Sequence, residues 1–263
     1  MASILNNIGA LGASRQLGIT NQGLQQTIQR LTTGSRINKA SDDAAGLAIS
    51  NKLNADIKVA GQGQRNANDG ISYLQVGDGV LDTVTNLLTR AAQLAQQAQT
   101  GTVDTTGRAA LDAEFSNIVA SIADIEKSTT FNGQTVFGTT LNVAVAGYTS
   151  VAVNVTTFNS LTSVNSLASV TSASAAALAI TSMITSVSAL RGTIGANESR
   201  LQAVSDTLGI QVENFTAAYS QIHDANIADE VVNLSKFQIL NQSGISALSK
   251  ANQSGQSILA LLQ

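Results

Sequence analysis

The sequence predicts a mainly α-helical protein whose N- and C-terminal segments form a long antiparallel, coiled-coil-like helix bundle, with small β-hairpins in the central region. Three observations support this prediction. Apolar residues recur at helical spacing in long blocks at both ends of the chain. The 263 residues include no proline, which costs about 3 kcal/mol in a helix interior. Residues 128–190 include no charged side chain, so an uncharged centre separates two patterned ends that we expect to pair.

The first forty residues are predicted to form an amphipathic helix followed by an irregular connector. Apolar residues recur mostly three, four or seven positions apart over residues 4–31. A short polar stretch that contains Gly34 interrupts this pattern, and residues 36–40 are expected to be irregular. Asp42 and Asp43 then supply the acceptor groups and negative charge that favour the start of the next helix.

A long helix is predicted from about residue 44 to residue 100, because its apolar residues keep a near-heptad register. At 1.5 Å per residue it would be about 85 Å long, which indicates a rod rather than a globular core. The residues of the register are Ile71, Leu74, Leu81, Val84, Leu88, Ala91, Ala95 and Ala98. Five glycines in this helix, at positions 61, 63, 70, 77 and 79, either weaken it by up to about 1 kcal/mol each or allow neighbouring segments to approach closely. A shorter helix follows over about residues 105–127.

The central region is predicted to contain two hairpins and a connector. Asn132-Gly133 is a favoured two-residue hairpin turn. Alternating apolar residues over 141–145 and 151–155 predict a second hairpin with a loop over residues 146–150. A run with a period of three matches neither helix nor strand and is expected to be a connector on the surface. Its residues are Phe158, Leu161, Val164, Leu167 and Val170.

The C-terminal segment returns to heptads, which predicts a helix that pairs with the N-terminal block. Its main row is Val187, Ile194, Leu201, Leu208, Phe215 and Ile222. The outermost apolar rows, over residues 4–31 and 231–262, are thin by comparison. Alone they bury too little surface to offset an ordering entropy of about 1–2 kcal/mol per residue. We therefore expect these rows to order when other copies of the chain cover them.

The composition argues against several classes of function. A net charge of −3 without a basic stripe argues against nucleic-acid binding. The chain has no cysteine, and its one histidine, His223, has no second His or Cys to complete a zinc site. No Gly-x-Ser-x-Gly elbow is present. A catalytic domain inserted in the uncharged centre would have no acidic or basic side chain to use. We therefore predict no enzymatic activity, no cofactor and no metal.

Neither a signal peptide nor a membrane span is predicted. The first fifteen residues lack both a basic region and a continuous apolar region of the kind that signal peptides contain. No continuous apolar run approaches the roughly 18 residues of a transmembrane helix. We therefore expect no membrane insertion, and export, if it occurs, without a cleavable signal peptide.

Several motifs resemble those of bacterial flagellin. The match is close over residues 31–49 (LTTGSRINKASDDAAGLAI), 65–72 (RNANDGIS) and 130–133 (TFNG). Near the C-terminus, residues 236–240 (KFQIL), 251–253 (ANQ) and 261–262 (LL) are similar as well. The resemblance covers roughly residues 1–137 and 174–263.

The resemblance implies a structural subunit that self-assembles into the helical flagellar filament for swimming motility. A hook–filament junction protein of the same superfamily is the alternative. Three domains are implied: residues 1–40 with 231–263 as an inner filament core, residues 41–137 with 174–230 as a helical rod, and residues 138–173 as a short variable outer region. The apolar residues that would form the polymerisation seam are Leu17, Leu24, Ile28, Leu31, Leu234, Leu240, Leu248 and Leu262.

The resemblance also implies a location and a set of partners. The chain would be extracellular, in the bacterial flagellum. Its partners would be other copies of itself, a flagellar export chaperone and export apparatus, and the filament cap and hook-junction proteins. Flagellins are also recognised by Toll-like receptor 5 of a host, and the receptor-contact pattern falls here on Arg90, Leu94 and Glu114. Along one continuous helix Arg90 and Glu114 would be about 36 Å apart, so a turn must bring them together. The alternative is that Leu94 belongs to the helix seam and Arg90 is a solvated charge.

Overall fold

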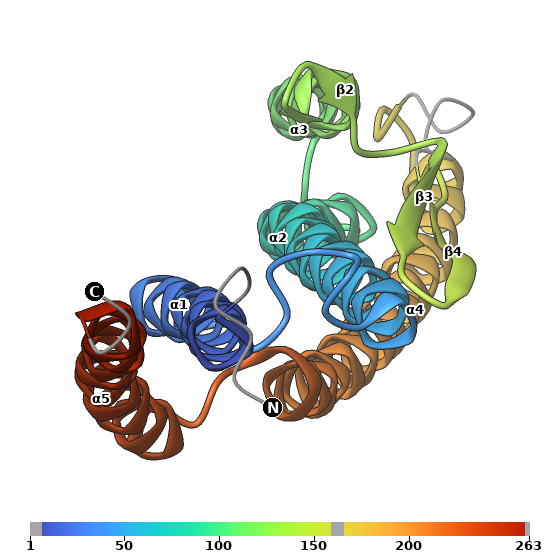
Figure 1. Ribbon diagram of the computed structural model, residues 1–263. Helices are drawn as coiled ribbons and strands as arrows, with labels where there is room; N and C mark the ends of the chain where they lie inside the picture. The colour runs from blue at the N-terminus through green and yellow to red at the C-terminus, as the bar shows by residue number, and fades with distance from the viewer. Residues whose placement is uncertain (1–6, 159–165, 261–263) are drawn as a thin grey trace. The chain divides into compact units, whose positions relative to one another are not determined.

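The computed structural model describes residues 7–158 and 166–260 of the chain (Figure 1). These residues form five helices and two small hairpins, which confirms the predicted mainly α-helical fold class with hairpins in the centre. The elements in order are α1 (Ile8–Thr33), α2 (Ala44–Ala98), α3 (Thr105–Ser128), β1 (Thr130–Phe131), β2 (Gln134–Thr135), β3 (Thr139–Val145), β4 (Tyr148–Val155), α4 (Val170–His223) and α5 (Ile227–Ala260). Residues 1–56 with 213–263 form one compact unit, and residues 57–212 form a second.

The ends of the helices follow from local side-chain chemistry. The Asn7 side chain accepts a hydrogen bond from the Ala10 amide at the start of α1, and Gly34 closes the helix with a left-handed φ of 70°. At the start of α2, the Asp43 carboxylate accepts a hydrogen bond of 2.8 Å from the Gly46 amide. The ends of α2 and α3 lie within two residues of those predicted.

In the second unit, a row of glycines on α2 lies against large apolar residues on α4. A Cβ atom built on Gly63 would lie 3.2 Å from Leu208 Cδ1, one on Gly70 would lie 3.0 Å from Leu201 Cδ1, and one on Gly77 would lie 3.6 Å from Ile194 Cδ1. All three glycines therefore allow the close approach that was one of the two expectations for them. By contrast, Gly79 has no atom of this kind within 4 Å, and Gly61 has only a distant contact with the Arg65 side chain.

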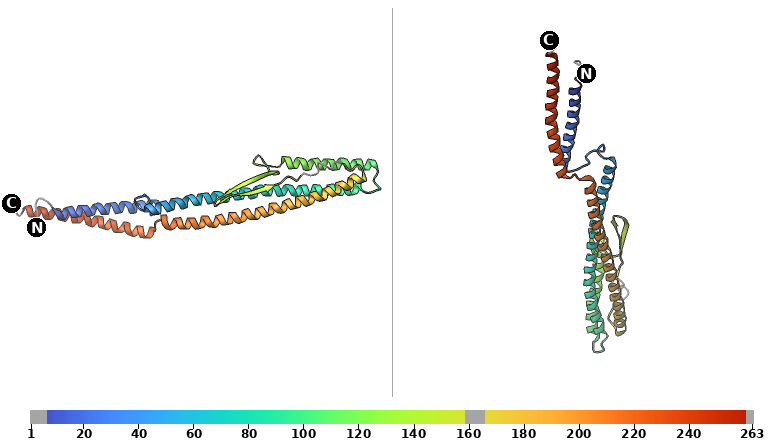
Figure 2. Two further views of the ribbon diagram at one scale, coloured as in Figure 1. Left: turned by 90° about the vertical axis from the view of Figure 1, so that its right-hand side faces the viewer. Right: turned by 60° about the horizontal axis from the view of Figure 1, so that its bottom comes forward.

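The heptad row of α2 continues beyond the glycines. Its apolar core is formed with α4, which lies alongside α2 within this unit (Figure 2). The row predicted on α4 is buried from Val187 to Leu208, whereas Phe215 and Ile222 are half-buried. The apolar residues of α2 that are fully or almost fully buried are Ala60, Ala67, Leu74, Leu81, Val84, Leu88, Ala91, Leu94, Ala95 and Ala98.

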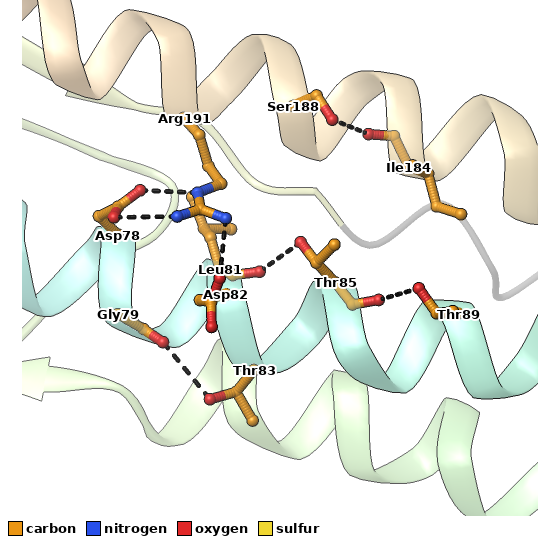
Figure 3. A network of polar contacts seen from close by, with 10 residues as sticks. All are labelled: Asp78, Gly79, Leu81, Asp82, Thr83, Thr85, Thr89, Ile184, Ser188 and Arg191. Carbon is orange, nitrogen blue, oxygen red and sulfur yellow. Dashed lines mark hydrogen bonds and ion pairs between the residues drawn. The ribbon is translucent and has the colours of Figure 1, made fainter.

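One arginine joins α4 to α2 through a fork of ion pairs (Figure 3). Arg191 Nε lies 2.8 Å from Asp78 Oδ1, Nη2 lies 3.2 Å from Asp78 Oδ2, and Nη1 lies 3.0 Å from Asp82 Oδ1. Hydrogen bonding to Asp78, supported by Asp82, raises the pKa of the Arg191 guanidinium above its ordinary value.

Both predicted hairpins are present. Asn132 and Gly133 form the first turn with φ values of 51° and 79°, as a type I′ turn requires. The second hairpin was predicted with a loop over residues 146–150, but β4 already begins at Tyr148 and pairs there with Val145. Gly147, with a φ of 75°, makes this turn tighter than the alternation of apolar residues indicated.

The predicted surface connector is partly a buried segment. Phe158 and Leu167 are 5 % and 0 % exposed, because α3 holds their backbone amides. Glu126 Oε1 accepts a hydrogen bond of 3.2 Å from the Phe158 amide, and Asp112 Oδ1 accepts one from the Leu167 amide. Leu161 and Val164 lie outside the described residues. Val170, the last residue of the period-three run, begins α4 instead of ending the connector.

Among the described residues, α4 is the one helix that is long and apolar enough to cross a membrane when length and composition alone are considered. Its most apolar 18-residue window has a mean hydropathy of 1.6. The window contains many serines and threonines among its apolar residues. A search for a continuous apolar run therefore does not identify this segment. The core helix of a soluble protein satisfies the same criterion, and α4 packs one face against α2.

Replacing Gly63 with alanine should destabilise the protein, whereas replacing Gly79 with alanine should stabilise it. A Cβ atom on Gly63 would lie 2.6 Å from the backbone nitrogen of Ala146 in the hairpin, and overpacking of this kind costs about 1–3 kcal/mol. Gly79 occupies the same helix with open space around it, so Gly79→Ala gains up to about 1 kcal/mol of helix propensity. Thermal unfolding followed by circular dichroism measures both effects. Equal shifts in the two variants would contradict the close contact at Gly63.

Candidate assembly surface

Helices α1 and α5 form an antiparallel pair in the first unit (Figure 2). Polar contacts follow the pair along its length. Asn7 Nδ2 donates a hydrogen bond of 2.8 Å to the Ala251 carbonyl, and the Asn241 side chain donates to Asn21 Oδ1. Because residue numbers rise along α1 as those of the contacting residues fall along α5, the two helices run in opposite directions.

Glycines give the pair its closest contacts. A Cβ atom on Gly23 would lie 2.6 Å from the Phe237 ring, and one on Gly244 would lie 3.2 Å from Leu17 Cδ1. Each helix therefore inserts one large side chain over a glycine of the other helix. The Phe237 ring is one of only six phenylalanines in the chain, and it marks the pairing position along the two helices.

A partly buried ion pair holds the helices near the end of α1. Arg30 Nη1 lies 3.2 Å from Glu230 Oε1, and the Glu230 side chain is 10 % exposed. The second carboxylate oxygen of Glu230 is buried and has no hydrogen-bond partner among the described residues. Glu230 also lies in the first turn of α5, where its negative charge favours the helix dipole.

Most of the apolar surface of the pair stays uncovered. No large apolar side chain described in α1 or α5 is buried, and the buried residues of the pair are Thr20, Thr27 and Glu230. The side chains of Leu11 and Val232 are 75 % and 67 % exposed. The other exposed large apolar residues of these helices are Ile8, Ile19, Ile28, Ile227, Val231, Ile239, Leu240 and Ile245.

The residues predicted for the polymerisation seam fall into two groups. Ile28 and Leu240 are exposed, while five are half-buried between the helices or beside them. The half-buried residues are Leu17, Leu24, Leu31, Leu234 and Leu248. Leu262 lies outside the described residues. The pair thus covers one side of the seam and presents the other side to solvent.

A compact joint closes the ends of α1 and α4 in the same unit. The Arg36 amide donates a hydrogen bond of 2.7 Å to the His223 carbonyl, and the Ala225 amide donates one of 2.9 Å to the Gly34 carbonyl. The Arg36 guanidinium donates through Nε and Nη2 to the Ile222 carbonyl, at 3.2 and 2.8 Å. This cation at the end of α4 complements the helix dipole. Sequence reasoning missed Arg36, because nothing near it in the sequence shows that it reaches a carbonyl 186 residues away.

Asp42 stabilises the connector that follows α1. Its Oδ2 accepts hydrogen bonds of 3.1 Å from the Asn38 amide and 3.0 Å from the Lys39 amide. These two amides hold the pKa of the Asp42 carboxyl below its usual value. Asp43 alone caps α2, so the two acidic residues divide the roles that sequence reasoning gave to both.

His223 takes part in the joint through its backbone and its ring. The ring stacks on Tyr219 with centroids 4.7 Å apart. Its Nδ1 lies 3.5 Å from Asp224 Oδ1, which is too long for a strong hydrogen bond. In the parts of the chain that the structure describes, no group of three His, Asp or Glu side chains is arranged to hold a metal ion.

Arg90 and Glu114 are brought together by the turn between α2 and α3. Arg90 Nη2 lies 2.7 Å from Glu114 Oε1, and the two side chains are 52 % and 45 % exposed. Leu94 lies one turn along α2 from Arg90, but it is 1 % exposed and belongs to the core. This position therefore presents an exposed ion pair, whereas Leu94 beside it is buried in the core.

Comparison with known proteins gives the same family across both ends of the chain. Residues 4–142 match the bacterial flagellin N-terminal helical region, and residues 178–262 match the bacterial flagellin C-terminal helical region. A flagellin of Halalkalibacterium halodurans is 36 % identical, with 99 % of each chain covered. Flagellin FlaB1 of Treponema pallidum is 33 % identical, also with 99 % of each chain covered.

A solved structure supports the same relationship. The crystal structure of Bacillus cereus flagellin superposes with a TM-score of 0.52 at 27 % identity, covering 59 % of this chain and 94 % of that one. A flagellar filament 30.7 kDa core protein of Treponema maltophilum is 33 % identical, with 98 % of this chain and 99 % of that one covered. None of these relatives favours the hook-junction alternative. The chain belongs to the bacterial flagellins, the structural subunits of the flagellar filament.

Proposed function

We propose that the exposed apolar face of the α1·α5 pair is the surface through which copies of this flagellin assemble. Its seam consists of Leu17, Leu24, Ile28, Leu31, Leu234, Leu240, Leu248 and Leu262. The observation that supports it is that ten large apolar side chains of these two helices are exposed and that none of those described is fully buried. A contact between different faces of successive copies does not close on itself, so it produces an open helical polymer.

The size of the exposed surface suits assembly. Covering one large aliphatic side chain contributes about 1.5–3 kcal/mol. A few such side chains from each copy offset the translational and rotational entropy that association costs, which is estimated at about 4–15 kcal/mol. The Arg30–Glu230 pair does not enter that sum, because it joins two helices of the same copy.

The three-part division of the chain is also a proposal. Residues 1–40 with 231–263 would form the filament core, residues 41–137 with 174–230 the rod, and residues 138–173 the outer region. The separation of the α1·α5 pair from the glycine-lined packing of α2 and α4 supports it. The sequence boundaries of the two compact units differ from these, because they fall between residues 56 and 57 and between residues 212 and 213. Helices α2 and α4 therefore each contribute to both units.

Membership of the family supports proposals for further partners and for the route to the filament. We propose passage through the flagellar export apparatus without a cleavable signal peptide, an export chaperone on the C-terminal helix, and contacts with the filament cap and hook-junction proteins. The exposed Val231, Val232 and Ile239 give a chaperone an apolar stripe to cover. In the extracellular filament the chain would act as a structural subunit without catalytic activity.

Toll-like receptor 5 is a further proposed partner, and the exposed Arg90–Glu114 ion pair supports it. The pair presents a cation and an anion on neighbouring helices, where a partner of complementary charge can reach both. Leu94 would act from below by supporting the helix surface, because its side chain is buried in this chain.

Replacing Ile28 and Leu240 with glutamine should block filament growth while leaving the monomer folded. Each change removes an exposed apolar side chain that the neighbouring copy would cover, so together they should raise the critical concentration for elongation by about a hundredfold or more. Purified subunits added to filament seeds, followed by light scattering and electron microscopy, measure this concentration. Removing residues 1–35 should abolish elongation altogether.

The matched control is Leu178→Gln on α4. Leu178 is 72 % exposed, so the change has the same chemistry but lies outside the seam. It should leave elongation and the thermal midpoint unchanged. Elongation that continues after both seam substitutions, or after truncation, would rule out the terminal seam.

Replacing Arg90 and Glu114 with alanine should lower activation of Toll-like receptor 5 in a reporter cell assay, because the two charges are exposed and paired. Exposed ion pairs contribute only about 0–1 kcal/mol to folding, so the thermal midpoint should barely change. Lys127→Ala on α3, also an exposed charge, is the control and should leave the response intact. An unchanged response in the double variant would exclude this pair as the contact.

A further inference from the structure

The packing between α2 and α4 repeats every seven residues along both helices. Moving forward by one heptad along the glycine row of α2 corresponds to moving back by one heptad along α4. Thus Gly63 faces Leu208 and Gly77 faces Ile194. Continuing the same step brings the next buried residues of the two helices together. These are Val84, Ala91 and Ala98 on α2 and Val187, Ile180 and Ala173 on α4.

A repeat of this kind leaves the axial register poorly determined by shape. If α4 moved by one heptad along α2, the glycines would still meet large apolar side chains. Val84 would meet Ile194 or Ile180 in place of Val187, depending on the direction of the slide. A difference of one methylene group is the kind of change that protein cores tolerate. At the glycines and at Val84, apolar packing therefore opposes such a slide only weakly.

The hydroxyl groups near Arg191 do not resist a slide either. Thr85 and Thr89 on α2 donate to the carbonyls of Leu81 and Thr85, and Ser188 on α4 donates to the carbonyl of Ile184 (Figure 3). These hydrogen bonds stay within one helix, so they survive any movement between the helices.

Arg191 is the residue in this network that crosses from one helix to the other. Its guanidinium holds both oxygens of Asp78 and one of Asp82. A slide of one heptad would place it opposite Thr85 and Thr89 in one direction, or opposite Ile71 and Gln75 in the other. Neither pair contains a carboxylate.

The other polar contacts between α2 and α4 are neutral and longer. Ser205 Oγ lies 3.4 Å from Asn68 Oδ1, and Gln99 Nε2 lies 3.4 Å from the Ala173 carbonyl. Charge-assisted, bidentate hydrogen bonds are roughly twice as strong as neutral ones. The Arg191 fork is therefore the strongest polar contact that a slide would break.

We propose that Arg191 fixes the axial register of α4 on α2, and thereby selects one of several nearly equivalent packings of this helix pair. The fork is a charged contact at the border of a repeating interface, where the side chains of Arg191, Asp78 and Asp82 are 34 %, 40 % and 62 % exposed. It would set the register as a polar residue does in many coiled coils. A filament needs every subunit to have the same length and shape. A single register in every copy meets this requirement, independently of which residues form the polymerisation seam.

A pair of spin labels on the full chain tests the register directly. The protein has no cysteine, so Gln93→Cys on α2 and Ser199→Cys on α4 provide two unique, exposed labelling sites. By continuing the register, their separation along the helices is about 30 Å, and a slide of seven residues changes it by about 10 Å. Pulsed electron–electron double resonance on the monomer measures the distribution of this distance.

Four backgrounds give the decisive comparison. The otherwise unaltered chain should show one distance. Arg191→Met should add a second population about 10 Å shorter or longer. Reversing the fork, with Arg191→Glu, Asp78→Arg and Asp82→Gln in one chain, should restore the single distance. Arg200→Met, which removes an exposed arginine of the same helix that has no ion pair among the described residues, should leave it unchanged.

Two results would overturn the proposal. One is a single, unshifted distance in Arg191→Met, which would show that packing alone sets the register. The other is a broad distribution with loss of the helical circular dichroism signal, which would make Arg191 a residue needed for folding rather than for choosing a register. The reversed fork separates charge pairing from side-chain volume, because failure to restore the single distance would also count against a role for the ion pairs.

Discussion

The second unit depends on the contact between the glycine row of α2 and the aliphatic row of α4. The chain has no tryptophan and few other aromatic residues, so it must gain its stability from many small dispersion contacts. Glycine at three successive heptad positions lets Leu208, Leu201 and Ile194 approach the backbone of α2 itself. The same glycines accept the hairpin region from another side, where a Cβ atom would lie 3.4 Å or less from Ala146, Val143 or Val136. The cost of about 1 kcal/mol per glycine in helix propensity is offset by close contacts on two sides.

The α1·α5 pair follows the opposite principle. Its contacts are a partly buried ion pair, amide hydrogen bonds and two large side chains placed over glycines. These contacts align the helices, but they leave the apolar rows largely uncovered. A subunit that covered these rows internally would have no apolar surface left for its neighbours. The incomplete burial of apolar residues in this pair is thus consistent with assembly. The dense packing of α2 against α4 suits a region whose core is formed within each copy.

Sequence reasoning succeeded where the determining signal is local or periodic. The heptads of α2, the caps beside it and the Asn132-Gly133 turn depend on residues close in sequence, and the structure confirms them. It failed where a distant segment decides the outcome. Gly147 makes a tight turn that alternation alone did not locate, and the reach of Arg36 to Ile222 depends on two connectors meeting in space. The burial of Leu94 also depends on packing between helices. The heptad register had indicated this burial as the alternative to a role in receptor contact.

The structure provides a physical account of part of the uncharged stretch. Residues 170–190 form the first part of α4, where threonine and serine hydroxyls donate to carbonyls four residues earlier in the same helix. Thr181, Thr185 and Ser188 are examples, and they require no partner on α2. Such side chains can border an apolar seam at little cost, since they carry no charge to desolvate and their donor groups are satisfied. A charge at the same border needs a partner across the seam, and the first one that the sequence admits, Arg191, lies where α2 supplies two carboxylates. Between Asp82 and the end of α2 there is no carboxylate, so a cation earlier on α4 would have no such partner on α2.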